Sequence, residues 1–170
     1  MTDEILDLVN EHDEVISSLS RNNIYKQKLK NFRVVNAILV NVDNEIWLPI
    51  RNKNKTLFPL SLDTSVGGHV KSGESYSQAL FRETKEELNI DLASCPFSFL
   101  FELNPNVHLT SAFMHVYKIF WSGAISPNYN TEDIESGKWY EVSEAISLIE
   151  EGTKCKSDLP LILKKLIRKC

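Results

Sequence analysis

The segment from Gly68 to Ile90 constrains this chain more than any other, because it places four glutamates and one arginine around a turn and one helix. Ser72 and Gly73 favour a turn, and apolar residues then recur at helical spacing. We therefore expect a helix that begins near Ser75 and continues to Asn89.

Three carboxylates share one face of this expected helix. Glu86 and Glu87 follow Glu83 by three and four positions, which places all three within about a third of the helix circumference. Like charges at this spacing repel one another, whereas a hard divalent cation such as Mg²⁺ or Mn²⁺ turns the repulsion into binding. The cluster predicts a metal site. The alternative is a solvated acidic face on which Arg82 and Glu86 form an ordinary ion pair.

The same residues resemble the Nudix box of the Nudix hydrolases. The family's pattern has a glycine, a glutamate, an Arg-Glu pair, a Glu-Glu pair and a final hydrophobic residue at fixed spacing, and it is matched by Gly68, Glu74, Arg82, Glu83, Glu86, Glu87 and Ile90. Thr84 replaces an aliphatic residue of the pattern, and Asn89 replaces a glycine. Asparagine is the residue after glycine that best tolerates the left-handed conformation ending a helix, so these departures concern local stability more than chemistry.

The resemblance implies a metal-dependent hydrolase that cleaves a diphosphate linkage in a nucleoside-diphosphate-type or related small substrate. The catalytic residues it implies are Arg82, Glu83 and Glu87, and the implied metal ligands are the Gly68 carbonyl, Glu83, Glu86 and Glu87. Glu83 is either a ligand or the base that activates water, and Arg82 orients it by a bidentate salt bridge. Neighbouring carboxylates titrate together, so the choice of one base stays open.

Substrate contacts are harder to assign from sequence. Arg51, Lys53 and Lys55 follow an expected core strand and are placed to bind a diphosphate, with Arg51 and Lys53 as our candidates. His69 lies beside the metal turn and is a third candidate. The alternative for the basic loop is plain solvation, which is the commoner fate of lysines.

The N-terminal segment resembles the isopentenyl-diphosphate isomerase-like branch of the family, through residues 4–11, the Val15-Ile16 pair and Arg21. Those isomerases carry a cysteine where this chain has Gly67, and histidine ligands on the strand before the box, where residues 30–42 contain no histidine. We therefore favour hydrolysis, because function is argued from the site. Isomerisation and a ligand-sensing Nudix domain without turnover are the alternatives.

Composition agrees with one enzyme domain over residues 1–170, with an N-terminal extension at 1–30 and the box at 68–90. A chain of 170 residues with a net charge of −4 carries no long basic stripe, so we expect a small-molecule partner and no nucleic acid. Three widely spaced cysteines without a Cys-x-x-Cys pair indicate free thiols in a reducing cytoplasm. The sequence shows no secretion signal or membrane-length apolar run, and a homodimer is left open.

The hydrophobic pattern predicts an α/β fold, an α/β/α sandwich around a mixed β-sheet, which is also the fold that the Nudix resemblance implies. After a hairpin, or a strand leading into a short helix, at the N-terminus, the expected strands are 32–42, 45–50, 97–103, 111–121 and 139–142. Gly67 and Gly68 are expected in a turn. Helices are expected at 144–150 and 159–169. Trp47, Phe58 and Tyr117 are expected in the core rather than against a substrate base.

Overall fold

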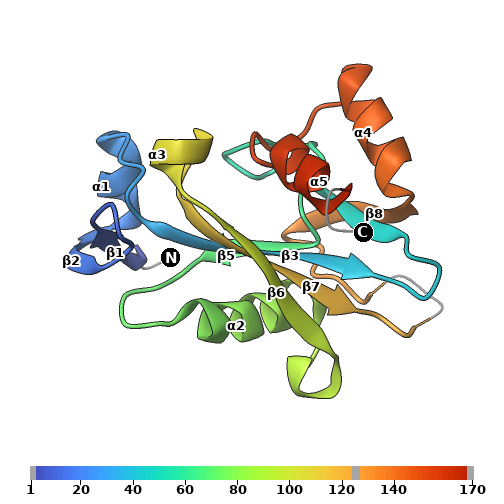
Figure 1. Cartoon of the computed structure of the whole chain (residues 1–170), viewed down its shortest axis with the longest axis horizontal. Coiled ribbons are helices and arrows are strands. Elements are labelled where there is room, and N and C mark those ends of the chain that lie inside the picture. The colour runs from blue at the N-terminus through green and yellow to red at the C-terminus, as the bar shows by residue number, and fades with distance from the viewer. Residues whose placement is uncertain (1–2, 124–126, 168–170) are drawn as a thin grey trace.

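The computed structural model describes residues 3–123 and 127–167 (Figure 1). Its strands are β1 (Ile5–Val9), β2 (Val15–Ser20), β3 (Arg33–Val40), β4 (Ile46–Arg51), β5 (Val66–His69), β6 (Phe97–Leu103), β7 (Phe113–Phe120) and β8 (Ile134–Tyr140). Its helices are α1 (Arg21–Lys26), α2 (Tyr76–Leu88), the 3₁₀ turn η1 (Leu92–Ser94), α3 (Pro105–His108), α4 (Val142–Glu150) and α5 (Leu159–Ile167).

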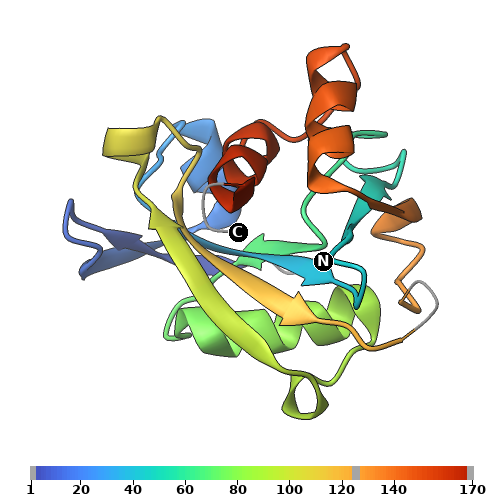
Figure 2. The ribbon, with the colours of Figure 1, turned by 45° about the vertical axis from the view of Figure 1, so that its right-hand side comes forward.

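The main sheet is mixed, as predicted. Its strand order is β6-β7-β3-β4-β8. β4 pairs only with the end of β3, and β5 pairs with the preceding residues of β3. β3 and β7 are parallel along the whole of β3, whereas the other pairs are antiparallel. In Figures 1 and 2, α2 covers one face of this sheet while α5, with α4 beside it, covers the other. The expected α/β/α sandwich is confirmed.

The alternation of β3 divides the core between the two layers. Val35, Ala37 and Leu39 pack with the apolar residues of α2, whereas Ile38 and Val40 pack with those of α5. Successive side chains of a strand point to opposite faces, so a strand buried on both sides reads as a continuous apolar run. Trp47 and Tyr117 lie in the α2 layer of this core, which confirms the expectation for both. Phe58 is exposed, so the expectation is wrong for this residue.

The N-terminal residues form both of the elements that we considered, a hairpin and then a helix. β1 pairs with β2, and α1 follows directly. Ile24 of α1 is buried with Leu6, Phe32 and Ala112 in a small apolar cluster of its own. This cluster fixes the hairpin against the start of β3.

Several boundaries differ from those that the sequence suggested. β8 begins at Ile134, earlier than the expected 139, because most of its side chains are exposed or half-buried and give little apolar signal. The short helix α3 was not predicted; it begins with Pro105, which is favoured in the first turn of a helix. The last helix is described to Ile167, and residues 168–170 lie outside the described part of the chain.

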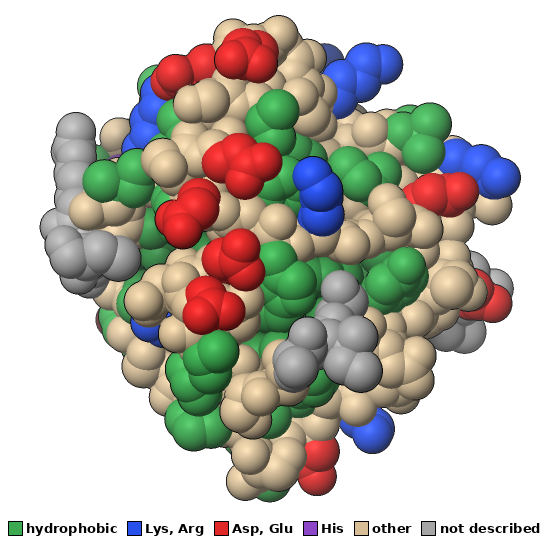
Figure 3. All heavy atoms as spheres, turned by 90° about the vertical axis from the view of Figure 1, so that its right-hand side faces the viewer, with side chains coloured by type: hydrophobic (Ala, Val, Ile, Leu, Met, Phe, Trp, Pro, Cys, Tyr) green, Lys and Arg blue, Asp and Glu red, His purple; other side chains and the backbone are tan. Residues whose placement is uncertain are grey.

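Figure 3 shows the side of the molecule that carries α4 and β8. Acidic side chains form a scattered column there, and the basic side chains visible in that view do not form a continuous surface. Among the described residues, the helices are all too short or too polar to cross a lipid bilayer.

Candidate active site

Gly67 and Gly68 lie in strand β5 rather than in the expected turn. Gly67 is paired with Asn36 of β3, and Gly68 is paired with Val35. This pairing joins distant parts of the chain, so the local turn preference of two glycines misled the prediction. A Cβ on Gly68 would lie 1.9 Å from the Cδ atom of Glu83. The Glu83 side chain therefore packs directly on the Gly68 backbone.

The backbone N–H and C=O groups of successive residues of β5 point to opposite edges of the strand. The Gly67 N–H donates to Glu87 Oε2 at 3.0 Å, and the His69 carbonyl accepts from Arg82 Nη2 at 2.9 Å. Polar groups of alternate residues point to the same edge of a strand. The backbone groups of Gly67 and His69 therefore face the charged residues of α2, while those of Gly68 face β3. The Gly67 carbonyl therefore lies on the side of the acidic residues, whereas the carbonyl of Gly68, the expected backbone ligand, faces β3.

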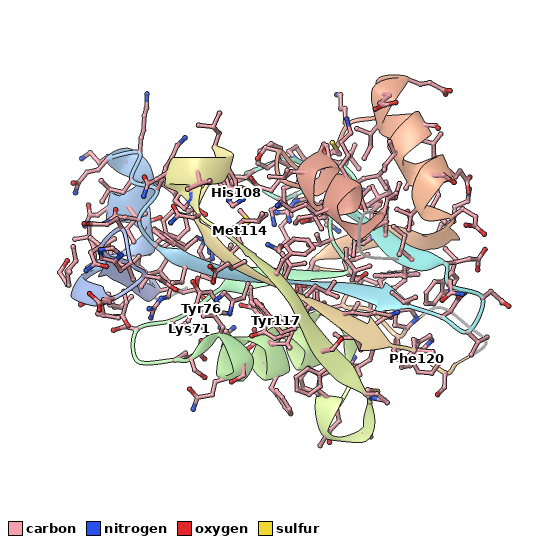
Figure 4. The ribbon with its side chains drawn as sticks, viewed as in Figure 1. Lys71, Tyr76, His108, Met114, Tyr117 and Phe120 are labelled. Atoms are coloured by element: carbon pink, nitrogen blue, oxygen red, sulfur yellow. The ribbon has the colours of Figure 1, made fainter. Side chains whose placement is uncertain are left out.

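The loop from β5 to α2 is bonded to the N-terminal hairpin. The buried carboxylate of Asp7 accepts from Ser72 Oγ at 2.6 Å and from the Gly73 N–H at 3.0 Å. Leu6 and Lys71 form a β-bridge beside these contacts. Figure 4 shows Lys71 and Tyr76 at the amino-terminal end of α2, next to this hairpin.

Helix α2 begins and ends as the sequence predicted. Ser75 and Gln78 form a capping box at its start, which satisfies two free backbone N–H groups. Asn89 caps its end in the left-handed conformation, with φ of 55°. Between these ends the helix presents its three acidic residues differently: Glu83 is buried, Glu87 is half-buried and Glu86 is exposed.

Arg82 is the centre of an ion-pair network. Its bidentate partner is Glu74, with Nε–Oε1 and Nη2–Oε2 distances of 2.8 Å each. Glu83 receives a single contact, Nη1 to Oε1 at 2.6 Å, so the bidentate bridge that we expected between Arg82 and Glu83 is wrong. Glu86 lies 3.4 Å from the same nitrogen. Arg82 thus connects the loop carboxylate to the helix carboxylates.

The two inner carboxylates hold their protons more tightly than free glutamate. Burial raises the pKa of Glu83 to about 7, against the lowering effect of Arg82. Burial also raises the pKa of Glu87 well above its usual range, and the neighbouring Glu83 charge adds to this effect. Ionising both groups at neutral pH is therefore costly unless a cation accompanies them.

This donor set fits a divalent metal ion. Carboxylate and backbone carbonyl oxygens are the ligands that Mg²⁺ and Mn²⁺ prefer, and a cation would offset the burial of the two charges. Among the described residues, no group of three acidic, histidine or cysteine side chains already converges on one point. Glu83 is engaged by Arg82, so binding a metal requires Glu83 or the exposed Glu86 to change rotamer.

The three candidates for substrate contact lie in different environments. Arg51 ends β4 and binds the buried Asp63 with an Nη1–Oδ2 distance of 2.6 Å. Lys53 is exposed in the following loop. The His69 ring contacts the Tyr25 hydroxyl at 2.7 Å, and burial, with Arg21 second, lowers its pKa to about 3. His69 is therefore a neutral side chain at neutral pH.

The structure also brings together residues that sequence reasoning missed. Asp63 and Lys156 lie beside Gly67, and Tyr25 and Glu4 of the N-terminal segment lie beside His69. All four lie outside the box, and only Asp63 is near it in sequence, so the spacing of the box residues does not mark them.

Comparison with known proteins agrees with this geometry. Residues 30–160 match the NUDIX domain family. An uncharacterized Nudix hydrolase of Nostoc sp. is 47% identical over 156 residues, covering 92% of this chain and 91% of the relative. A Nudix hydrolase of Deinococcus radiodurans is 38% identical over 170 residues, covering 100% of this chain and 95% of the relative.

Solved structures show the same fold. A crystal structure of a Deinococcus radiodurans protein, 38% identical, superposes with a TM-score of 0.89 and covers 95% of this chain and 98% of that one. The family match, the two relatives and this superposition agree with the spacing of the acidic residues on α2. The chain belongs to the Nudix hydrolase family.

Proposed function

We propose that this protein is a metal-dependent hydrolase that cleaves the diphosphate linkage of a nucleoside-diphosphate-type or related small substrate. One observation carries the proposal: two carboxylates of α2, Glu83 and Glu87, are packed against the backbone of β5. Arg82 contacts Glu83, whereas Glu87 accepts from a backbone N–H. Arg82 is shared with Glu74, so the pair carries an excess of negative charge once ionised.

Mg²⁺ or Mn²⁺ is the cation that we propose. Glu83, Glu86 and Glu87 would hold it, together with a backbone carbonyl, for which Gly67 is now a better candidate than Gly68. When bound, such an ion neutralises the charge of a diphosphate and lowers the pKa of a water molecule. If no cation bound to these three glutamates, a lysine at one of their positions would make the helix more stable, because it would replace a repulsion by an ion pair.

The protein's own side chains supply positioning and proton transfer. In the absence of a metal ion, burial raises the pKa of Glu83 to about 7, and a carboxylate whose pKa lies near neutrality suits a general base. Arg82 holds Glu83 from one side through Nη1 while its other nitrogens bind Glu74. Since Glu83 and Glu87 influence each other, the base is assigned to the pair rather than to one atom.

For the substrate we propose that Arg51 and Lys53 contact the diphosphate. Arg51 is bound to Asp63, whose other oxygen lies 3.4 Å from Lys156 Nζ, and Lys53 is free to turn toward a ligand because its side chain is exposed. His69 remains a candidate for a neutral contact. Any such contact replaces its hydrogen bond to Tyr25 or uses the other ring nitrogen.

The experiment is a substrate panel followed by phosphorus NMR. Nucleoside di- and triphosphates, dinucleoside polyphosphates, ADP-ribose, NADH, coenzyme A and isopentenyl diphosphate are incubated with and without Mg²⁺ or Mn²⁺. We expect metal-dependent cleavage of a diphosphate bond in at least one compound. No cleavage of any of them in the presence of both metals would contradict the proposal.

A matched variant tests the site itself. Glu87→Gln removes a charge and keeps the side-chain shape, so turnover should fall by about a hundredfold or more while the protein stays folded. Glu132→Gln, an exposed glutamate outside α2, is the control and should retain full turnover. Equal turnover of folded Glu87→Gln and the wild type would remove Glu87 from the site.

Two alternatives from other classes are tested by the same panel. Isomerisation requires an acid or base at position 67, where a Cβ would already lie 3.1 Å from Asn36 Oδ1 and 3.2 Å from Thr64 Oγ1. Rearranged isopentenyl diphosphate without cleavage would support that branch. Binding of a nucleotide without turnover would support a sensor. Cytoplasmic location, the single domain over 1–170 and a homodimer stay predictions.

A further inference from the structure

Lys156 lies on the opposite side of β5 from the acidic residues. A Cβ on Gly67 would lie 3.2 Å from Lys156 Nζ, whereas a Cβ on Gly68 would enter the Glu83 carboxyl. Neighbouring residues of a strand project to opposite faces. The ammonium group and the carboxylates therefore flank the same two residues of one strand, from opposite faces of the sheet.

The backbone fixes Lys156 at this position. The Lys156 N–H donates to the Leu62 carbonyl at 2.8 Å, and the Leu62 N–H donates to the Lys154 carbonyl at 2.9 Å. Cys155 and Leu62 form the corresponding β-bridge. The segment that follows α4 is thereby attached beside Asp63, although it lies far from β5 in sequence. Lys156 is not a freely moving surface lysine.

Lys156 and Arg51 share one carboxylate, that of Asp63. The Lys156 side chain is 23% exposed, and Nζ lies 3.4 Å from Asp63 Oδ1. The other oxygen of Asp63 already binds Arg51 at 2.6 Å. One buried carboxylate therefore serves two cations, so Arg51 and Lys156 together carry one positive charge more than Asp63. An anion bound beside Lys156 would offset that charge.

The outer edge of β5 connects this cation to the acidic side. The Gly67 N–H points away from β3 along this edge and meets Glu87. A diphosphate lying along this edge would meet the α2 carboxylates on one side and the ammonium group on the other.

We propose that Lys156 binds a phosphate group of the diphosphate substrate, across β5 from the metal ligands. The inference rests on the proposed function and adds a specificity-determining residue to it. The ligand class is a pyrophosphate or a nucleoside diphosphate, whose oxygens accept hydrogen bonds from an ammonium group. Asp63 positions both Lys156 and Arg51, so the two cations are held ready for the same anion.

The test compares three lysine variants in a direct binding measurement. Lys156→Met removes the charge and keeps the length, Lys156→Arg keeps the charge, and Lys154→Met alters an exposed lysine of the same segment. Isothermal titration with methylenediphosphonate, which cannot be hydrolysed, is carried out in the presence of Mg²⁺. We expect the affinity of Lys156→Met to fall by about tenfold or more, while Lys156→Arg loses less and Lys154→Met matches the wild type.

Steady-state kinetics on the substrate found by the panel supply a second readout. Lys156→Met should raise KM by a similar factor with a smaller change in kcat, because the contact is made by the bound substrate before reaction. Thermal unfolding of each variant separates a binding effect from a loss of fold. Unchanged affinity for methylenediphosphonate in folded Lys156→Met, or no binding by the wild type, would overturn the inference.

The two proposals fail in different ways. A wild type that binds methylenediphosphonate through Lys156 but cleaves no compound of the panel would contradict the hydrolase and leave the phosphate site standing. A wild type that cleaves a substrate with the same KM in folded Lys156→Met would contradict the phosphate site alone.

Discussion

The hydroxyl of Thr84 is buried on the face of α2 that packs against the sheet. Thr84 is fully buried, and its Oγ1 has no hydrogen-bond partner within the described part of the chain. Thr84→Val replaces this hydroxyl by a methyl group of similar size. Because a buried unpaired hydroxyl is costly, we expect the free energy of unfolding to rise by about 1 kcal/mol. Urea denaturation measures it, and a loss of stability would mean that the hydroxyl has a partner in solution.

A second residue-level prediction concerns the close contact at Gly68. In Gly68→Ala the new Cβ would overlap the Glu83 carboxyl, which lies on this backbone. Glu83 must move, so metal-dependent turnover should fall by about a hundredfold or more. Gly67→Ala is the matched variant, since its nearest neighbours lie at 3.1 Å and beyond. Activity assays on both should rank Gly68→Ala well below Gly67→Ala; the reverse order would contradict the geometry of Glu83.

At the scale of elements, the end of α2 depends on one backbone conformation. Asn89 adopts the left-handed region, which costs an ordinary residue about 1 kcal/mol or more. We expect Asn89→Ala to lower the free energy of unfolding by about 1 kcal/mol, and Asn89→Gly to preserve or raise it. Denaturation midpoints of the two variants give the comparison. A stable Asn89→Ala variant would show that the helix ends elsewhere in solution.

Helix α2 could be predicted from the sequence, whereas strand β5 could not. The fold class, the limits of α2 and its three acidic residues follow from local spacing, because helix periodicity and capping involve neighbours in sequence. The sequence predicts a turn at Gly67 and Gly68, because the pairing of β5 with β3 is a long-range contact that leaves no local pattern. Asp63 and Lys156 were missed for the same reason. Their positions depend on a bridge between Leu62 and Cys155 that no local pattern announces.

At the scale of the whole molecule, metal binding and stability should be linked through pH. The folded pKa of Glu83 is about 7, above the ordinary value of 4.5, so the folded metal-free protein holds a proton that the unfolded chain releases. Stability of the metal-free protein therefore falls as pH rises through this interval. A metal that binds the ionised carboxylate offsets this loss.

We accordingly expect the increase in Tm on adding Mg²⁺ to be small near about pH 5.5 and larger near about pH 8. Differential scanning calorimetry at both pH values, with and without the metal, measures it. Glu87→Gln should reduce the increase at the higher pH. An increase that is the same at both pH values would mean that protons and metal do not compete for these carboxylates.

The bond between Asp7 and the loop before α2 bears on how members of this family are compared. The family match begins at residue 30, after the hairpin that carries Asp7. A version of the protein that began at residue 30 would keep every acidic residue of the box and lose the carboxylate that holds Ser72 and Gly73. Two proteins with identical boxes, one with the hairpin and one without it, would then differ in how firmly the loop before α2 is held. A lower turnover rate of the protein without the hairpin would then reflect the position of this loop and not a change in the acidic residues.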